Sequence, residues 1–590
     1  MNVKTNRRPE KLKRSRSQRR ARPVAPDAPR AQPWSPAKIL GMIAAAGFLA
    51  LLIAYWPALT GEFVFDDVHM QFASAHPERL VLRDWLAGSR PLTGFSYWIN
   101  YQMGGTDTLG YHLTNLLLHY LAAWMVFLIV RKILEFAAVE SRRATIISGF
   151  CAALFLLHPL QTEAVAYISS RSENLSVALA FGAWAVFLYR PSKAITLPMV
   201  AAVLLLCGAA VTGKEHVALL PLVLLLTDYY WNPGFSFAGI RRNWRLYGTL
   251  AVLAAIMGSL LYSYLSREQT VGFHMKEFTW YQYLFTQCRV LFIYLRLFLF
   301  PAGQNADYDI ALSHSPLEHG AILGMAILIG ATLAIFVWRK RFPIASFGFF
   351  VALIFFLPTS SIMPIRDLAA ERRAYLPMIG LLLIVAEWLV RLRWNEKLLA
   401  GVLAGILAVA GVLTWNRSQV WAGSVALWSD AVAKSPQKAR PHLGLAAADL
   451  SAHRSAEAAV QYELANRLDS HYDATFYANW AAALEGAGRH QEALEMGRKA
   501  VQMGPNASTY DALGRIVALN GDIPQALELL EKGEKSDPAY LPIYIDRADI
   551  LMAVDRNTEA CAAFRKARSL DPQNPSAARG LAALHCPGAY

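Results

Sequence analysis

The stretch NWAAALEGAGRHQEALEMGRKAVQMGP (479–505) lies within a pattern that repeats about every 34 residues after residue 418. Alanine and larger apolar residues recur in it at the three- and four-residue spacing of a helix face. Each unit is therefore predicted to fold as two antiparallel helices. The successive units begin near Pro436, Ser470, Pro505, Pro538 and Pro572.

Small residues at the helix contacts and a proline at each boundary are typical of tetratricopeptide repeats. Four units fit, with a partial helix before them (420–436) and a terminal cap after them (573–585). Such solenoids bind peptides or protein partners, so the repeats predict a binding surface without naming its ligand. A disulfide between Cys561 and Cys586 is an option if this domain lies outside the cytoplasm.

The chain before the repeats is strongly apolar. Of all 590 residues, 55% are hydrophobic and 17% are charged, against about 25% charged in soluble domains. This composition excludes an ordinary cytosolic enzyme. A helix needs about 20 apolar residues to cross a bilayer, and eleven segments are predicted to do so: 39–59, 109–130, 144–160, 174–189, 195–212, 217–230, 246–265, 320–338, 344–363, 374–390 and 398–415.

Segment 281–300 is also apolar, but it carries Arg289 and Arg296 seven residues apart on one helical face. If it does not cross the membrane, the loops richest in Lys and Arg fall on the cytoplasmic side, as the positive-inside rule requires. We therefore expect 281–300 to be re-entrant or interfacial. Eleven crossings then give a multi-pass plasma (inner) membrane protein with a cytoplasmic N-terminus and periplasmic or extracytoplasmic repeats.

The first 37 residues contain eleven Lys and Arg and two acidic residues. With almost no large apolar side chain, this segment is predicted to be a disordered basic cytoplasmic tail. A nucleic-acid role is the other option for such a tail, but a cytoplasmic flank that orients the first membrane helix is favoured. The domains are then the tail (1–37), a membrane domain (38–418) and the repeats (419–590).

Two adjacent carboxylates, Asp66 and Asp67, follow the first predicted span in GEFVFDDVHM (61–70). Such a pair can supply a general base for a hydroxyl group and a second acid that orients it. A solvated turn or a helix N-cap is the alternative for an isolated pair. The adjacent carboxylates also leave a divalent cation open.

Further polar residues fall in the loops or at membrane depth on the same predicted side, where a bilayer makes them costly without a use. Taken singly, each fits a helix-end charge. Together, a base and converging cations suit transfer from a lipid-phosphate donor, because the cations stabilise the departing phosphate. The candidates for donor and phosphate binding are Arg90, His158, Glu163, Arg171, Lys214, Arg289, Arg296 and Arg372. The supporting candidates are His112, Asn115, His119, Glu215, Glu371 and Tyr375.

No glycine-rich nucleotide loop or His/Cys metal cluster occurs in the sequence. We therefore expect no firm cofactor and assign no metal ligands.

Several segments, in order, resemble the transmembrane and tetratricopeptide-repeat O-mannosyltransferases and their bacterial relatives, in the GT-C superfamily. The matching pieces span roughly residues 55–585 and are FVFDD, SRPL, GYHLTNLLLH, LHPLQTEAVAYISSR, GKE, AERRAYLP and the repeats. The resemblance implies an all-α fold, in which a GT-C helix bundle precedes the solenoid. It also implies that Asp66 and Asp67 form the catalytic acidic motif, and that the donor is a polyprenyl- or dolichyl-phosphate sugar.

We therefore expect a bacterial-type membrane glycosyltransferase that moves a sugar, mannose by family default, to a hydroxyl acceptor, with inversion at the anomeric carbon. The expected partners are the lipid-linked donor, membrane lipid and an acceptor protein held by the repeats. A GT-C enzyme that acts on a glycan or lipid acceptor is one alternative. A non-catalytic scaffold whose repeats recruit envelope proteins is another, and a transporter is disfavoured because no broken helices stand out at the midplane.

Overall fold

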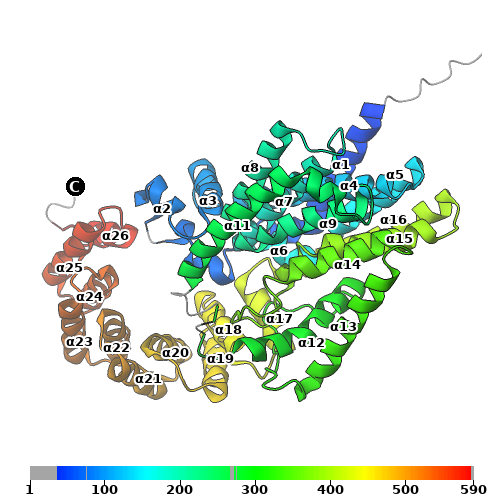
Figure 1. Ribbon diagram of the computed structural model, residues 1–590. Helices are drawn as coiled ribbons and strands as arrows, with labels where there is room; N and C mark the ends of the chain where they lie inside the picture. The colour runs from blue at the N-terminus through cyan, green and yellow to red at the C-terminus, as the bar shows by residue number, and fades with distance from the viewer. Residues whose placement is uncertain (1–35, 75, 266–271, 274, 587–590) are drawn as a thin grey trace, which may run out of the picture. The chain divides into compact units, whose positions relative to one another are not determined.

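A computed structural model of the chain describes residues 36–74, 76–265, 272–273 and 275–586, and these ranges are helical without any strand (Figure 1). The basic tail lies outside the described residues as far as residue 35. The first part of the chain holds α1 (Pro36–Tyr55), α2 (Leu82–Leu86), α3 (Pro91–Gly104), α4 (Thr108–Phe136), α5 (Ser141–Leu157), α6 (Thr162–Ala166), α7 (Arg171–Leu188), α8 (Leu197–Gly213), α9 (Leu220–Trp231), α10 (Ala238–Arg242), α11 (Trp244–Leu265), α12 (Trp280–Leu299), α13 (Ala321–Trp338), α14 (Pro343–Phe356), α15 (Met378–Arg391) and α16 (Glu396–Val420).

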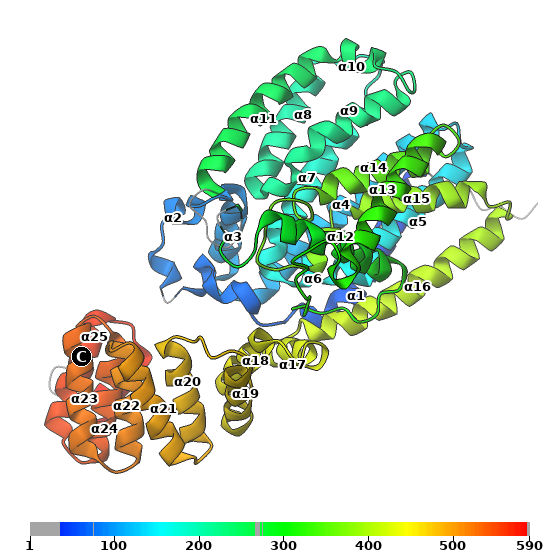
Figure 2. The ribbon, with the colours of Figure 1, turned by 60° about the horizontal axis from the view of Figure 1, so that its bottom comes forward.

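The repeats follow as pairs of helices, stacked one after another in Figure 2. The prolines of the sequence pattern fall between helices, where a missing N–H does the least harm. Pro505, for example, follows α21, and Pro538 follows α23. The helices are α17 (Ser424–Lys434), α18 (Ala439–Ser451), α19 (Ser455–Leu468), α20 (Ala474–Gly486), α21 (His490–Met503), α22 (Ala507–Leu519), α23 (Ile523–Ser536), α24 (Leu541–Ala553), α25 (Asn557–Leu570) and α26 (Pro575–Ala583).

Small residues fill the helix contacts in the repeats, as the pattern predicts. A Cβ on Gly514 of α22 would lie 3.0 Å from the Leu530 side chain of α23, so any larger residue would require that leucine to shift. At the end of the domain, Cys561 of α25 forms a disulfide with Cys586. The pairing that the sequence left as an option is therefore present.

The number of spans differs from the prediction. Among the residues that the structure describes, four helical segments are long and apolar enough to cross a membrane, which indicates a membrane protein: Gly41–Ala58, Thr108–Phe136, Glu318–Trp338 and Glu396–Val420. The bent pair α5–α6 is a fifth candidate. Eleven spans is therefore wrong by this measure of length and hydropathy.

Helix length explains part of the difference. The predicted spans 217–230, 344–363 and 374–390 contain α9, α14 and α15, which have only 12, 14 and 14 residues. At about 1.5 Å per residue, these helices are about 20 Å long, short of a hydrocarbon core of about 30 Å.

The core of the bundle brings α14 and α15 into direct backbone contact, and the two helices lie side by side in Figures 1 and 2. Gly348 and Gly380 face each other there, and a Cβ on either residue would clash with the carbonyl oxygen of the other. This contact fixes the segment 357–377 that joins the two helices. That segment includes the short 3-10 helix η9 (Glu371–Ala374), which carries Arg372.

Candidate active site

The acidic pair lies in the 3-10 helix η2 (Phe65–His69), and its two carboxylates have different surroundings. Asp67 is 0% exposed. Its carboxylate accepts hydrogen bonds from Val64 N at 3.1 Å and from Ser169 N at 2.7 Å, and also from the Ser169 hydroxyl. Asp66, the next residue along, has an exposed side chain, and its backbone N–H donates to the Tyr167 hydroxyl at 3.0 Å. Asp67 is thus enclosed by its hydrogen bonds, whereas the Asp66 carboxylate is open to solvent.

Burial raises the pKa of the Asp67 carboxyl to about 7, even though the bonds from Ser169 and Val64 favour its ionised form. Desolvation penalises the charged state of a carboxyl and so acts against those bonds. Asp67 therefore changes its charge near neutral pH. The hydrogen bonds that hold η2 in place become pH-dependent in the same range.

The residue before the pair adopts an uncommon backbone conformation. Phe65 has φ of +57°, in the left-handed region that a bulky residue rarely occupies. Its ring is held in place by Trp428, with centroids 5.2 Å apart, and by Tyr167, at 5.8 Å. The Arg440 guanidinium lies 5.7 Å from the same ring. Packing from α17 and the start of α18 thus stabilises a strained turn that sets the direction of Asp66.

Three cations among the predicted site residues are each paired with a carboxylate. Arg90 Nη2 lies 2.7 Å from Glu215 Oε1. Lys214 forms an ion pair with Glu173, which also has His216 Nε2 at 2.8 Å from its second oxygen. The third pair joins Arg372 to Glu163: the guanidinium pairs with the carboxylate, and the Arg372 backbone N–H donates to the same side chain at 3.1 Å.

These pairs belong to one cluster. Burial and the positive charges of Arg90 and Arg372 lower the pKa of the Lys214 amino group, against the opposing effect of Glu173. Burial, followed by the charges of Asp66 and Asp67, raises the pKa of Tyr167, and Arg372 acts in the other direction. Arg90, Lys214 and Arg372 are therefore within electrostatic reach of one another, and Arg372 acts on the same Tyr167 as Asp66 and Asp67.

The cluster retains access from outside. The side chains of Arg90, Lys214 and Arg372 are 39%, 15% and 19% exposed. Each of the three cations is therefore partly open to solvent in addition to its ion pair. Paired cations on rigid elements are suited to a doubly charged ligand, because their geometry is set before it binds.

Arg171 has a structural role instead of a phosphate-binding one. It is 0% exposed, and it donates to Asn115 Oδ1 at 2.9 Å, Tyr111 O at 2.8 Å, Ser96 O at 3.2 Å and the Asn100 side chain. All three guanidinium nitrogens are used. Arg171 therefore joins α3, α4 and α7 behind the site.

The histidine candidates are likewise used within the fold. His158 Nε2 contacts Phe298 O at 2.9 Å, and His158 Nδ1 accepts from Leu160 N at 3.1 Å. His119 contacts the Tyr375 hydroxyl at 2.8 Å and Leu156 O at 3.2 Å, and His112 lies 3.4 Å from Gly61 O. These side chains pack helices together, and none of these hydrogen bonds joins them to the three cations.

Glu371 supports the segment that carries Arg372. Its carboxylate accepts from Gln304 Nε2 at 2.6 Å, from Asn305 N at 2.7 Å and from the Tyr308 hydroxyl at 2.7 Å. Arg417 of α16 lies 3.9 Å from the same carboxylate. Burial raises the pKa of Glu371. This network joins η9 to the segment after α12.

The structure does not bring Arg289 and Arg296 to the cluster. Arg289 Nη1 donates to Ala311 O and to the Ser313 hydroxyl at 2.9 Å, and Arg296 Nη1 donates to Ala302 O at 2.8 Å. Within the described part of the chain, neither guanidinium has a hydrogen bond or ion pair with another candidate residue. Both attach α12 to the segment that follows it.

Several site residues escaped the sequence reasoning. Tyr167 and Ser169 lie in the motif LHPLQTEAVAYISSR (157–171), so this polar stretch already carried a signal. Trp428 and Arg440 gave none, because they come from the partial helix before the repeats and from the first repeat, far along the chain from Phe65. Arg440 also lies 2.9 Å from Asp367, which has Arg372 at 3.7 Å on its other side.

A metal site is the remaining chemical option. Among the described residues, no group of three or more His, Cys, Asp and Glu side chains is arranged to hold a metal ion. The dependence on a divalent cation that the adjacent carboxylates left open stays untested.

Comparison with known proteins gives relatives of one kind. The chain is 25% identical to the protein O-mannosyl-transferase F38B6.6 of Caenorhabditis elegans, over 72% of this chain and 62% of that protein. It is 24% identical to the human protein O-mannosyl-transferase TMTC3, over 90% of this chain and 64% of that protein. The chain is similar to protein O-mannosyl-transferases. It spans less than two thirds of the length of these relatives, and no protein-family model matches it.

A shorter match has a higher identity. A Drosophila melanogaster relative, the protein O-mannosyl-transferase Tmtc1, is 36% identical over 24% of this chain and 17% of its own length. All three relatives are animal proteins, so a bacterial-type member stays a prediction. Among solved structures, YrrB, a TPR protein with an unusual peptide-binding site, is 17% identical with a TM-score of 0.23, over 30% of this chain and 88% of that one. A TM-score this low carries no argument about the fold, which follows from the helices of this chain alone.

Proposed function

We propose that this chain is a membrane glycosyltransferase that moves mannose from a polyprenyl-phosphate donor to a serine or threonine hydroxyl of a protein. The observation that carries the proposal is the exposed Asp66 carboxylate, linked through Tyr167 to Arg372, one of a cluster of three paired, partly exposed cations. The similarity to protein O-mannosyl-transferases supports the sugar and the acceptor class.

In the proposed reaction, the acceptor oxygen attacks the anomeric carbon and gives its proton to Asp66. The bond between that carbon and the phosphate oxygen breaks, and its electron pair leaves with the phosphate. Arg90, Lys214 and Arg372 stabilise the added negative charge. Attack opposite to the leaving phosphate inverts the anomeric carbon, since no second exposed carboxylate beside Asp66 is assigned as a covalent nucleophile.

One feature supports an extracytoplasmic position of the repeats. The disulfide Cys561–Cys586 is typical of an oxidising compartment. The convergence of acid and cations favours an enzyme over a scaffold, because a scaffold needs no such cluster. The repeats are then available to hold the acceptor protein.

The test is transfer of labelled mannose from a polyprenyl-phosphate donor to a serine- and threonine-rich acceptor, by purified protein in lipid nanodiscs. Asp66→Asn should reduce transfer about 10²- to 10⁴-fold, because a carboxamide accepts no proton at neutral pH. Glu78→Gln is the matched control, since Glu78 is an exposed acid of the same loop. Equal transfer by Asp66→Asn and the wild type would remove Asp66 from the mechanism.

A further inference from the structure

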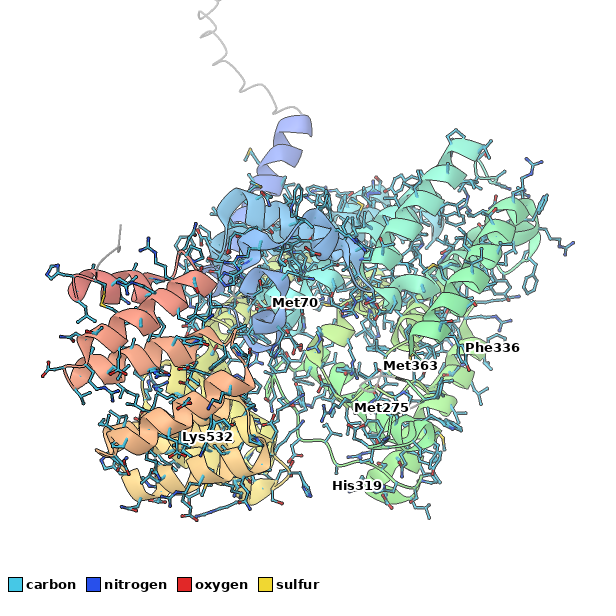
Figure 3. The ribbon with its side chains drawn as sticks, turned by 90° about the vertical axis from the view of Figure 1, so that its left-hand side faces the viewer. Met70, Met275, His319, Phe336, Met363 and Lys532 are labelled. Atoms are coloured by element: carbon cyan, nitrogen blue, oxygen red, sulfur yellow. A yellow bond between two sulfur atoms is a disulfide. The ribbon has the colours of Figure 1, made fainter. Side chains whose placement is uncertain are left out.

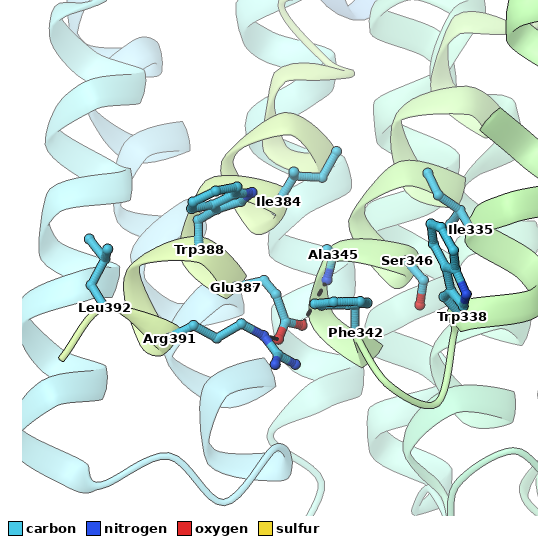
Figure 4. A pocket seen from close by; sticks show the side chains of 10 residues that line it. All are labelled: Ile335, Trp338, Phe342, Ala345, Ser346, Ile384, Glu387, Trp388, Arg391 and Leu392. Carbon is cyan, nitrogen blue, oxygen red and sulfur yellow. Dashed lines mark hydrogen bonds and ion pairs between the residues drawn. The ribbon is translucent and has the colours of Figure 1, made fainter.

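A cavity of about 510 Å³ lies between the ends of α13, α14 and α15 (Figure 4). Its size is within the range of small-molecule sites. Its walls are mainly aromatic and aliphatic, and the side chains that line them are Ile335, Trp338, Phe342, Ala345, Ser346, Ile384, Glu387, Trp388, Arg391 and Leu392. An apolar cavity of this kind favours an apolar occupant over a polar one.

The cavity lies at the end of α15 that is remote from the candidate active site. Arg372 precedes α15, whereas Arg391 is its last residue. The 14 residues of the helix separate the two ends by about 20 Å. The cavity is therefore a site of its own.

The protein leaves this cavity open to a membrane. Only 11% of the apolar window of the span Glu318–Trp338, which ends at the cavity, is buried inside the protein. Trp338 and Trp388 in the cavity wall are 56% and 70% exposed. Exposed indoles at the end of an apolar span are typical of the level of lipid headgroups.

One polar arrangement fixes the geometry of the rim. The buried Glu387 carboxylate accepts from Ile344 N at 2.9 Å and Ala345 N at 3.2 Å, and from Arg391 Nε at 2.6 Å. Arg391 Nη2 also donates to Arg341 O at 2.6 Å. The Arg391 guanidinium lies 4.4 Å from the Phe342 ring, and its side chain is 46% exposed. Arg391 is thus held at the mouth of the cavity.

The neighbouring cations have no acid of their own. Within the described ranges, Arg339, Lys340 and Arg341 form no ion pair with a carboxylate. Arg341 is exposed, and its guanidinium lies 5.5 Å from the Phe342 ring. Arg339 lies over Phe336, whose ring is on the outside of the bundle in Figure 3. Three cations without a counter-charge at the edge of an apolar cavity are complementary to an anionic amphiphile.

We propose that this cavity binds one anionic phospholipid, with an acyl chain between α13 and α15 and its phosphate beside Arg341 and Arg391. The walls supply the apolar contact and the rim supplies the counter-charge. A lipid without net charge would gain the apolar contact with the walls but not the counter-charge of the rim. This inference is independent of the proposed glycosyl transfer.

The test uses the full-length protein, stripped of lipid in detergent and titrated with phosphatidylglycerol or phosphatidylcholine of equal acyl chains. Native mass spectrometry counts the lipid bound. Phosphatidylglycerol should bind as one saturable copy, about tenfold more tightly than phosphatidylcholine. Arg341→Gln should remove most of this preference, since it deletes an exposed charge without leaving a buried acid. Arg393→Gln is the matched control, because Arg393 is an exposed cation nearby that does not line the cavity.

A second variant tests the acyl-chain site separately. Ile384→Trp should fill the cavity and weaken both lipids by a similar factor, while the preference for the anionic lipid stays. Equal binding of the two lipids by the wild type would overturn the proposal. So would an equal loss of preference in Arg393→Gln and Arg341→Gln, or a saturable copy of lipid that Ile384→Trp leaves unchanged.

Discussion

The two ends of α15 differ in how their cations are paired. At the end that begins after Arg372, each of the three clustered cations faces a carboxylate, as Arg372 faces Glu163. At the other end, Arg391 pairs with Glu387, but Arg339, Lys340 and Arg341 form no ion pair with a carboxylate among the described residues. Paired cations in a half-buried site are already in place for a ligand that binds and leaves. Unpaired cations at the edge of a bundle depend on a counter-charge from outside, such as lipid phosphate.

The largest effect expected from this difference is on stability. Arg372→Gln should lower the free energy of unfolding by about 3–5 kcal/mol, because it leaves the buried Glu163 carboxylate without its partner. Arg341→Gln should change it by no more than about 0.5 kcal/mol, as a surface change does. Thermal unfolding of both variants in the same detergent checks the contrast. Equal melting temperatures would mean that the pairing at the active-site end does not support the fold.

The second effect is a pH dependence confined to the active-site end. Because burial raises the pKa of Asp67 to about 7, transfer should fall about tenfold for each pH unit below 7, as protonation weakens the bonds that position η2. The effect on stability has the opposite sign. The folded pKa exceeds the unfolded value of about 3.9, so the contribution of Asp67 is fully present below pH 4 and is lost as the pH rises through 7.

Rates of transfer between pH 5 and 8.5 measure the first of these effects, and melting temperatures over the same range measure the second. Asp67→Asn should lower the rate and abolish its rise between pH 5 and 7. A merely structural defect would lower the rate at every pH and keep that rise. Arg341→Gln, at the other end of α15, should keep the pH dependence of the wild-type rate. If the rate of Asp67→Asn still rises between pH 5 and 7, another group is responsible for the titration.

The smallest effect concerns donor binding. Lys214→Gln should raise the apparent KM for the lipid-linked donor about tenfold, since one charge-assisted contact to the phosphate is lost. The fold should hold, because Glu173 keeps His216 as a partner. Lys340→Gln removes the same charge at the opposite end and should leave KM unchanged. Steady-state kinetics at limiting donor measure KM for both variants. An equal rise in KM for Lys214→Gln and Lys340→Gln would indicate that the charge acts only through general attraction of the protein to the membrane.

Local patterns predicted the helices of this protein well and their membrane roles less well. The repeat period predicted the helix pairs and the partial helix that became α17, because small residues and prolines recur at fixed positions within each unit. The same apolar runs overstated the number of spans. Hydropathy does not reveal that α9, α14 and α15 end after 12 to 14 residues.

In the candidate site, too, the sequence identified residues whose surroundings it did not predict. Sequence placed Asp66 and Asp67 together as equals, and the structure separated them, because Ser169 and Val64 enclose only Asp67. It also proposed Arg171 as a phosphate ligand, whereas four partners from α3 and α4 occupy that guanidinium. Neither difference has a signature in the spacing of residues.

By itself, the sequence determined the all-helical class, the repeats and the identity of the polar residues available for chemistry, since periodicity and composition are local properties of the chain. Only the tertiary structure decided which of these residues meet. Whether a carboxylate is exposed, and whether a cation has a partner, depends on contacts such as Arg372 with Glu163, which join residues far apart in the chain. Burial and pairing set the charge of a group, so the chemistry of the site follows from packing.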